Sequence, residues 1–172
     1  FVKPHMAIDE EARNRATSIY LVDRVIPMFP EVLSNDLCSL NEAEDKLTFS
    51  AVFTFPGETL SEPSKKVEPI SEWFGRTIIH SNKRFTYEGA QKVLDDDTGL
   101  YHKELVILNT LAKKLEKQDR DAGAISFSHD EVKFVLDEHK KPIGVYRKEI
   151  QDTNKLIEQF MLLANRKVAE FV

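Results

Sequence analysis

Residues 46–55 read KLTFSAVFTF, and their alternation of apolar and polar side chains is the most regular in the chain. Successive side chains of a β-strand point to opposite faces, so an apolar residue at every second position predicts a strand with one apolar face. That face consists of Leu47, Phe49, Ala51, Phe53 and Phe55. Pro56 and Gly57 follow at once and end the strand, because proline cannot donate a hydrogen bond to a strand ladder.

The sequence that follows predicts an antiparallel partner for this strand. Residues 57–69 are polar and contain Pro63 and Pro69, which predicts a mobile loop. Residues 70–79 are rich in aromatic and β-branched side chains, among them Trp73 and Phe74, and predict the second strand.

Helices are predicted after the second strand. Thr86 can cap a short helix that runs to about Leu94, and the stretch from Asp95 to Gly99 breaks it. A longer amphipathic helix follows, because leucines recur at helical spacing and lysines lie mostly on the opposite face. Its apolar face comprises Leu100, Leu105, Leu108, Leu111, Ala112 and Leu115.

The last third of the chain predicts short strands and a final helix. Residues 124–127 and 132–136 suit strands, and a polar turn at 138–142 lets residues 143–146 pair back as a hairpin. A helix is predicted over residues 151–171. Its apolar stripe comprises Leu156, Ile157, Phe160, Leu163, Ala164 and Val168.

On the amino-terminal side, Asp9 is predicted to cap a helix that begins at Glu10. Residues 18–22 suit a strand, and residues 31–40 suit a short helix that follows Pro30. Helices and mostly antiparallel strands in irregular order indicate an α+β fold, in which helices flank the strands and no βαβ unit repeats.

Composition bounds the class of protein. The 172 residues suit one domain or a large part of one, and 41% apolar with 31% charged residues indicates a soluble globular protein. No apolar run approaches the roughly 20 residues of a membrane-spanning helix, so we expect no membrane partner. The single cysteine, Cys38, favours the reducing cytoplasm, and its apolar neighbours predict a buried, inert thiol rather than a reactive one.

The balance of charge bears on nucleic-acid binding. The net charge is −5, whereas free-standing nucleic-acid-binding domains usually carry a basic excess. Any contact with RNA would therefore use local groups or basic modules elsewhere in the protein. The chain also opens with Phe1 rather than Met, as expected of a segment of something longer.

Three ordered blocks of sequence carry a family resemblance. The first runs RATSIYL at residues 15–21, RVIPMFP at 24–30 and EVLSNDLCSL at 31–40. The second is WFGRTII at 73–79 with FTY at 85–87, and the third comprises DAGAI at 121–125, FVLD at 134–137 and LIEQFMLLAN at 156–165. Together they resemble the catalytic (RNB) domain of the ribonuclease R / ribonuclease II family.

The resemblance implies that residues 1–172 are an internal segment of one RNB-type catalytic domain. Members of this family are hydrolases, processive exoribonucleases that degrade RNA from a single-stranded 3′ end to nucleoside 5′-monophosphates with Mg²⁺. Their metal ligands lie in an Asp-rich motif upstream of the part that matches Phe1, and an Arg and a Glu near the scissile phosphate lie downstream of the part that matches Val172. We therefore expect no catalytic residue, metal ligand or bound Mg²⁺ in this span, and no activity from the span alone.

Two candidate RNA-binding residues follow from the resemblance. Tyr87 matches a family tyrosine that stacks on a base near the 3′ end and helps to set the size of the final product. The alternative is that Tyr87 packs against the start of its own helix. Arg15 matches a recurrent family arginine and, like Arg24, could contact phosphates. The alternative is that these arginines pair with the nearby carboxylates of Asp9, Glu11 or Asp23.

Other candidate sites have simpler interpretations. Consecutive carboxylates at Asp95, Asp96 and Asp97 point in different directions and converge poorly on one ion, so they predict a solvated loop. The five histidines are dispersed and show no metal-ligand spacing. Because no catalytic motif is evident, a non-catalytic RNA- or protein-interaction module remains the alternative to part of a nuclease.

Overall fold

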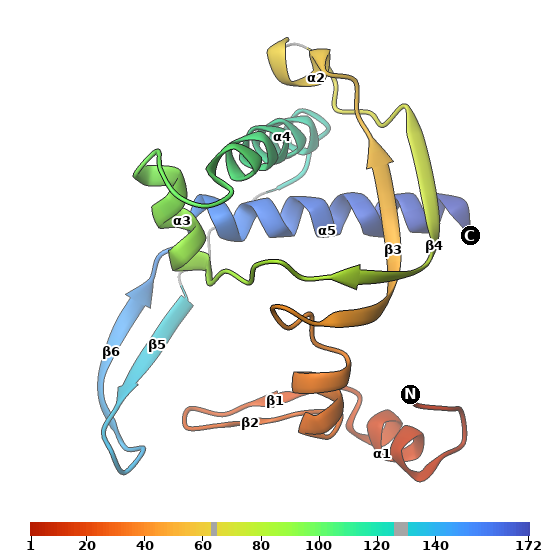
Figure 1. Cartoon of the computed structure of the whole chain (residues 1–172). Helices are drawn as coiled ribbons and strands as arrows, with labels where there is room; N and C mark the ends of the chain where they lie inside the picture. The colour runs from red at the N-terminus through yellow and green to blue at the C-terminus, as the bar shows by residue number, and fades with distance from the viewer. Residues whose placement is uncertain (63–64, 126–130) are drawn as a thin grey trace. The chain divides into compact units, whose positions relative to one another are not determined.

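The computed structural model describes residues 1–62, 65–125 and 131–172 (Figure 1). The chain divides into two compact units. The first comprises Phe1–Thr48, Ile78–Arg84 and Glu131–Lys148, and the second comprises Phe49–Thr77, Phe85–Asp130 and Glu149–Val172. The division passes through strands β3 (Asp45–Thr54) and β4 (Ser71–His80), so each unit holds one end of this strand pair.

The first unit begins with a helix, a hairpin and a π-helix. These elements are α1 (Ala7–Arg15), β1 (Ile19–Tyr20), β2 (Val25–Ile26) and the π-helix Val32–Leu37. Strands β1 and β2 are antiparallel, with Ile19 opposite Ile26 and Tyr20 opposite Val25. The predicted strand at 18–22 and helix at 31–40 are present but shorter than expected, and the helix is of the π type.

The prediction that Asp9 caps a helix beginning at Glu10 is wrong. Helix α1 begins at Ala7, and the extended residue before it is Met6. The Asp9 carboxylate instead accepts the backbone N–H of His5 at 2.9 Å and the Arg13 Nε–H at 3.1 Å. These bonds lower the pKa of Asp9, chiefly through the His5 N–H. The carboxylate therefore ties down the chain that precedes the helix.

Strands β3 and β4 form the predicted antiparallel pair. The Ile70 N–H donates to the Thr54 carbonyl at 2.8 Å at one end, and the Ser81 N–H donates to the Glu44 carbonyl at 3.3 Å at the other. The single apolar face predicted for residues 46–55 does not run the length of the strand.

The buried face of β3 changes part-way along the strand. Leu47 and Phe49 are 71% and 69% exposed, whereas Phe53 is partly buried on the core of the second unit. Consecutive half-buried residues, Ser50 and Ala51, mark the change. Side chains before Ser50 are therefore covered on one face of the strand, and those after Ala51 on the other.

The polar stretch at 57–69 is more structured than predicted. It contains the helical turn α2 (Glu58–Ser61), and Val67 is buried in the core of the second unit. Pro63 lies outside the described residues. The interpretation of the whole stretch as a mobile loop is therefore wrong. Residues 58–61 form a helical turn, and burial of Val67 in the core holds the end of the stretch in place.

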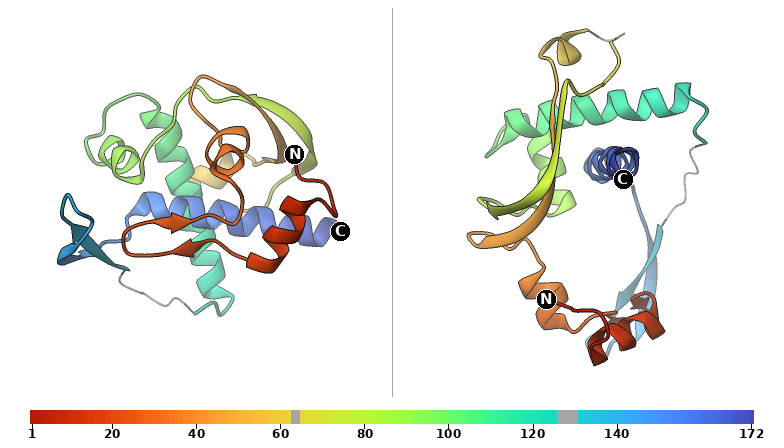
Figure 2. Two further views of the ribbon diagram at one scale, coloured as in Figure 1. Left: turned by 90° about the horizontal axis from the view of Figure 1, so that it is seen from below. Right: turned by 90° about the vertical axis from the view of Figure 1, so that its right-hand side faces the viewer.

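Three helices dominate the second unit: α3 (Tyr87–Asp95), α4 (His102–Asp121) and α5 (Asp152–Phe171). Helix α4 crosses α5 steeply, as the end-on view of α5 in Figure 2 shows. The core between them consists of Val67, Leu111, Leu115 and Leu163, against which Phe53, Phe55 and Phe160 pack.

The predicted apolar stripes are only partly buried. Leu111, Ala112 and Leu115 are buried on α4, but Leu100 and Leu108 are exposed. On α5, Leu156 and Leu163 are buried, whereas Ile157 is exposed. Thr153 and Gln159 take buried positions on α5 that the stripe did not include, because the steep crossing covers only a short part of each helix.

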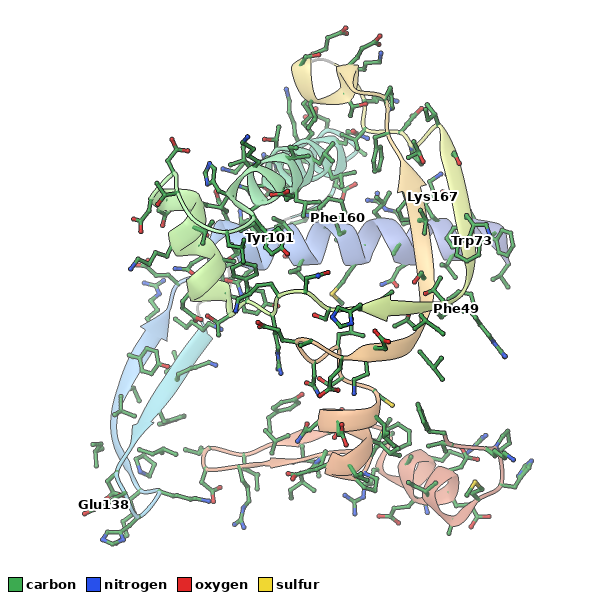
Figure 3. All side chains as sticks on the ribbon, viewed as in Figure 1. Phe49, Trp73, Tyr101, Glu138, Phe160 and Lys167 are labelled. Carbon is green, nitrogen blue, oxygen red and sulfur yellow. The ribbon has the colours of Figure 1, made fainter. Side chains whose placement is uncertain are left out.

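The far end of α5 is fastened to β4. Lys167, labelled in Figure 3, lies 2.9 Å from Glu72 of β4. The ring centroids of Phe74 and Phe171 are 5.1 Å apart. Hydrogen bonds to Glu72 and Glu170 raise the pKa of Lys167. This end of the helix is held by charge and aromatic contacts rather than by buried leucines.

Strands β5 (Glu131–Leu136) and β6 (Pro142–Lys148) form the hairpin predicted for the last third of the chain. Val132 lies opposite Arg147 and Phe134 opposite Val145, and the register shifts between Val135 and Leu136. The strand predicted at 124–127 is not formed at Ala124 or Ile125, and its remaining residues lie outside the described part of the chain. The fold is α+β with short antiparallel strands, as predicted. Among the described residues, no helix combines the length and the apolar character needed to cross a bilayer.

We expect Leu115→Ala to lower the free energy of unfolding by about 2–5 kcal/mol, because this side chain is buried and its truncation leaves a cavity. Leu108→Ala on the same helix should cost less than about 1 kcal/mol, since Leu108 is 37% exposed. Urea unfolding followed by circular dichroism measures both losses. Equal losses would contradict the location of the core.

Candidate functional site

Tyr87 is the first residue of α3, and the helix begins as the sequence predicts. Thr86 is extended, and its hydroxyl accepts the Gly89 N–H at 3.0 Å, which satisfies one of the unpaired donors at the helix start. The Tyr87 side chain is 41% exposed, so part of its ring surface is open to solvent.

The amino-terminal end of α5 holds the backbone of Tyr87 in place. Thr153 is buried, and its hydroxyl donates to the Tyr87 carbonyl at 3.1 Å. The Thr153 N–H donates to the side-chain oxygen of Gln91, one turn further along α3, at 3.2 Å. These two bonds fix the first turn of α3 against α5.

The turn between α3 and α4 supports the same region from the other side. Asp97, Gly99 and Tyr101 all have positive φ angles. Glycine adopts this conformation at little cost, and the other two are held in it by the surrounding turn. Tyr101, labelled in Figure 3, packs edge-on against Phe85 with ring centroids 6.5 Å apart.

His102 joins the two ends of this turn. Its Nδ1 lies 2.9 Å from the Val93 carbonyl oxygen, and its Nε2 lies 2.8 Å from a carboxylate oxygen of Asp97. The imidazole ring therefore lies between the end of α3 and the turn that follows it. The His102 side chain, at the first residue of α4, thus links this helix to the end of α3 and to the turn between them.

The three consecutive aspartates do not form a shared site. All three are exposed. Asp95 accepts a hydrogen bond from the Gln91 side chain at 2.9 Å, and Asp97 lies beside His102. Among the described residues, no group of three or more His, Cys, Asp or Glu side chains converges on a point where a metal ion could bind.

In the first unit, both candidate arginines have carboxylate partners. Arg15 lies 2.7 Å from Glu11, and it also donates to the Pro27 carbonyl at 3.2 Å. Arg24 lies 3.3 Å from Asp23. These are the pairings expected of structural arginines, and phosphate contact by Arg15 stays a prediction.

Tyr20 is a candidate that the sequence did not single out. It lies on β1 opposite Val25 and is 79% exposed, the highest value among the aromatic residues that the structure describes. The hairpin is closed by the Leu21 N–H, which donates to the Arg24 carbonyl at 2.9 Å. The available signal was an aromatic residue between two arginines, Arg15 and Arg24, in a run predicted only as a strand.

The prediction of a buried thiol at Cys38 is wrong. Cys38 directly follows the π-helix and is exposed. No residue of this helix is buried, so its apolar residues do not cover the thiol.

Comparison with known proteins decides the family. A model of the RNB domain matches residues 1–172. The chain belongs to the RNB domain family. This RNB segment is 36% identical over 178 residues to ribonuclease R of Escherichia coli, covering 100% of the segment and 21% of that relative. It is 38% identical over 187 residues to DIS3-like exonuclease 2 of Caenorhabditis elegans, covering 99% and 21%.

A third sequence relative and the solved structures agree. Human exosome complex exonuclease RRP44 is 38% identical over 176 residues, covering 99% of the RNB segment and 17% of that protein. RNase R of Mycoplasma genitalium in complex with double-stranded RNA gives a TM-score of 0.85 at 31% identity, covering 99% and 30%. Yeast Ssd1, a pseudonuclease, shares the fold with a TM-score of 0.71 at 18% identity, covering 98% and 20%. The segment thus spans less than a third of each of these relatives.

The attachment of α5 to α4 next to Tyr87 should depend on pH. Asp152 lies 2.6 Å from Lys113 of α4, and this hydrogen bond is the main cause that lowers the pKa of Asp152 below its usual 3.8. A carboxyl whose pKa is lower in the folded state stabilises that state above its unfolded pKa, and this contribution is lost as the pH falls towards the folded value.

We therefore expect Asp152→Asn to lower stability near neutral pH and to flatten the loss of stability below about pH 4. Thermal unfolding between neutral and acidic pH measures this. Asp96→Asn removes an exposed carboxylate at the end of α3 and serves as the control. An identical acid profile for Asp152→Asn and the unchanged protein would contradict the expectation.

Proposed function

We propose that the protein containing this segment is a processive 3′-to-5′ exoribonuclease, a hydrolase that releases nucleoside 5′-monophosphates from single-stranded RNA ends. The observation that carries the proposal is the match of the RNB domain model to the whole chain. Identity of 36% to ribonuclease R and 38% to RRP44, over nearly the whole segment, supports it. So does the likeness to RNase R structures that are described as complexes with single-stranded and double-stranded RNA.

The role that we propose for this segment is to support and contact RNA rather than to cleave it. Stacking of a base on an aromatic ring contributes about 1–3 kcal/mol and tolerates any base, which suits an enzyme that degrades every sequence. Tyr87 is the residue that the family resemblance favours. Its backbone is held by Thr153, so its ring projects from a fixed point.

Tyr20 is a second stacking candidate, and its exposure favours it. A ring that stacks on a base must present a whole face, and Tyr20 is 79% exposed against 41% for Tyr87. Arg15 and Arg24 lie nearby in the sequence, and each is paired with one carboxylate, Glu11 and Asp23 respectively. We propose that Arg15 contributes a phosphate contact beside this ring.

Mg²⁺ is part of the proposal for the whole protein but not for this segment. Mg²⁺ prefers several oxygen ligands in near-octahedral geometry. The described residues do not fit this requirement, since their three-aspartate run is exposed and two of its carboxylates already have partners. No step of the reaction is assigned to the metal through these residues. One cysteine, which leaves no internal disulfide, supports a cytoplasmic setting.

Activity of the complete protein tests the proposal. With Mg²⁺ and a labelled single-stranded RNA, we expect release of nucleoside 5′-monophosphates from the 3′ end and loss of that release on addition of a chelator. Chromatography of the products identifies them. Absence of mononucleotides would overturn the proposal and favour a non-catalytic interaction module.

Substitution of the two tyrosines tests their roles. If Tyr20 or Tyr87 stacks on a base, we expect its replacement by Ala to weaken RNA binding by roughly 5- to 150-fold. The same variant should also change the length of the shortest oligonucleotide left after degradation. The matching Phe variants keep the ring and should retain the original length. Tyr146→Ala, at another exposed tyrosine on β6, is the control. An unchanged final length in both Ala variants would contradict both assignments.

A further inference from the structure

A basic pocket of about 480 Å³ lies in the second unit, beside the carboxyl-terminal half of α4. Its cationic lining residues are Lys65, Lys66, Lys114, Lys117 and Arg166. Two carboxylates, Asp119 and Asp121, also line it. The pocket is lined by five cationic and two anionic side chains, whereas the whole chain has a net charge of −5. The net charge of the pocket lining is therefore positive, opposite in sign to that of the whole chain.

The walls of this pocket are held by contacts within the protein. Val67 is buried in the helical core, and its N–H donates to the side chain of Gln118 on α4. This anchors the adjacent residues Lys65 and Lys66 beside the helix. Lys114 donates to the carbonyl oxygens of Thr59 and Glu62, the latter at 2.6 Å, which holds the segment around α2 against α4.

Not all of the cations are neutralised inside the protein. Lys65 is bound to Glu58, and Arg166 makes a two-pronged contact with Asp119 at 2.6 and 3.2 Å. Lys114 binds carbonyl oxygens, so its charge is retained and the third proton of its ammonium group is still available.

Lys66 and Lys117 are exposed. Within the described parts of the chain, neither forms an ion pair with a carboxylate. Together with Lys114, they leave three positive charges facing a pocket in which Asp121 is the one carboxylate not bound to Arg166. An anion is the ligand that this balance favours.

A second cavity adjoins the first and has a different character. Its volume is about 320 Å³, and it shares Asp119, Ala122 and Arg166 with the basic pocket. Its other lining residues, Ala124 and Leu162, are apolar. A charged compartment next to an apolar one matches the chemistry of a nucleotide, in which a phosphate and a flat base lie a few ångströms apart.

We propose that these adjoining cavities bind one nucleotide unit, with its phosphate among Lys66, Lys114 and Lys117 and its base against Ala122 and Leu162. The choice of RNA as the source of that unit rests on the proposed function, whereas the phosphate chemistry does not. The unit belongs either to an RNA strand or to a released 5′-mononucleotide.

The test measures binding with the complete protein in a chelator, so that no RNA is degraded. Fluorescence anisotropy with labelled single-stranded oligouridylate is followed from about 50 to 200 mM salt. The double variant Lys66→Gln/Lys117→Gln removes two exposed charges from the pocket. Its matched control, Lys92→Gln/Lys103→Gln, removes two exposed charges from α3 and α4 outside the lining residues. Thermal unfolding verifies that both variants fold.

We expect the pocket variant to bind RNA roughly tenfold more weakly. We also expect the slope of log affinity against log salt to fall by about 0.7, the value for one phosphate contact on a single strand. The control should change neither. An unchanged affinity and slope in the pocket variant, or equal losses in the control, would overturn the proposal.

Small ligands separate the two sources and test the apolar half. Uridine 5′-monophosphate that competes with RNA in the unchanged protein, but not in the pocket variant, would identify a mononucleotide site. Weaker RNA binding by the pocket variant, with no competition by uridine 5′-monophosphate in the unchanged protein, would identify a contact with an RNA strand. If inorganic phosphate competes as well as uridine 5′-monophosphate, the assignment of a base to the apolar cavity is wrong. Lack of mononucleotide release in the activity assay would overturn the proposed function and leave this binding test unaffected.

Discussion

The steep crossing of α4 over α5 is the contact on which the second unit, which contains α3, α4 and α5, depends. Leu111 and Leu115 from α4 meet Leu163 from α5, and Val67 inserts from the segment before β4. Burial of each such side chain contributes about 1.5–3 kcal/mol relative to its exposure. Because one core holds all these segments, it also fixes features at its edges. The wall of the basic pocket follows from Val67, and the start of α3 follows from Thr153 at the near end of α5.

The elements that the sequence predicts well are those whose signals are local. The cap at Thr86 and the leucine spacing of α4 need only a few neighbouring residues, and the structure confirms both. The reversal of β3 is different, because Ser50 and Ala51 are half-buried for reasons that lie outside the strand. Val67 shows the same limit, since one apolar residue in a polar stretch has no periodicity to reveal its burial.

The candidate site residues likewise differ in whether local sequence signals reveal them. Tyr87 was identified through family resemblance, and its place at a capped helix start was predictable. Tyr20 was not predictable as a site residue, because a strand pattern alone does not show that β1 is two residues long and leaves Tyr20 exposed. The basic pocket was not predictable from the sequence. Its lysines come from two stretches far apart in the chain, which the burial of Val67 and the bonds of Gln118 and Lys114 bring together.

Cys38 has a practical consequence. It is the single cysteine of these 172 residues and it is exposed, just after the π-helix of the first unit. A thiol in this position is a ready attachment point for a spin label or fluorophore, with no background from other thiols of the segment. A second cysteine introduced on the outer face of α5 would make a pair of probes, one on each unit. The distance between the two labels, measured with and without RNA, would then report whether the first and second units move relative to each other.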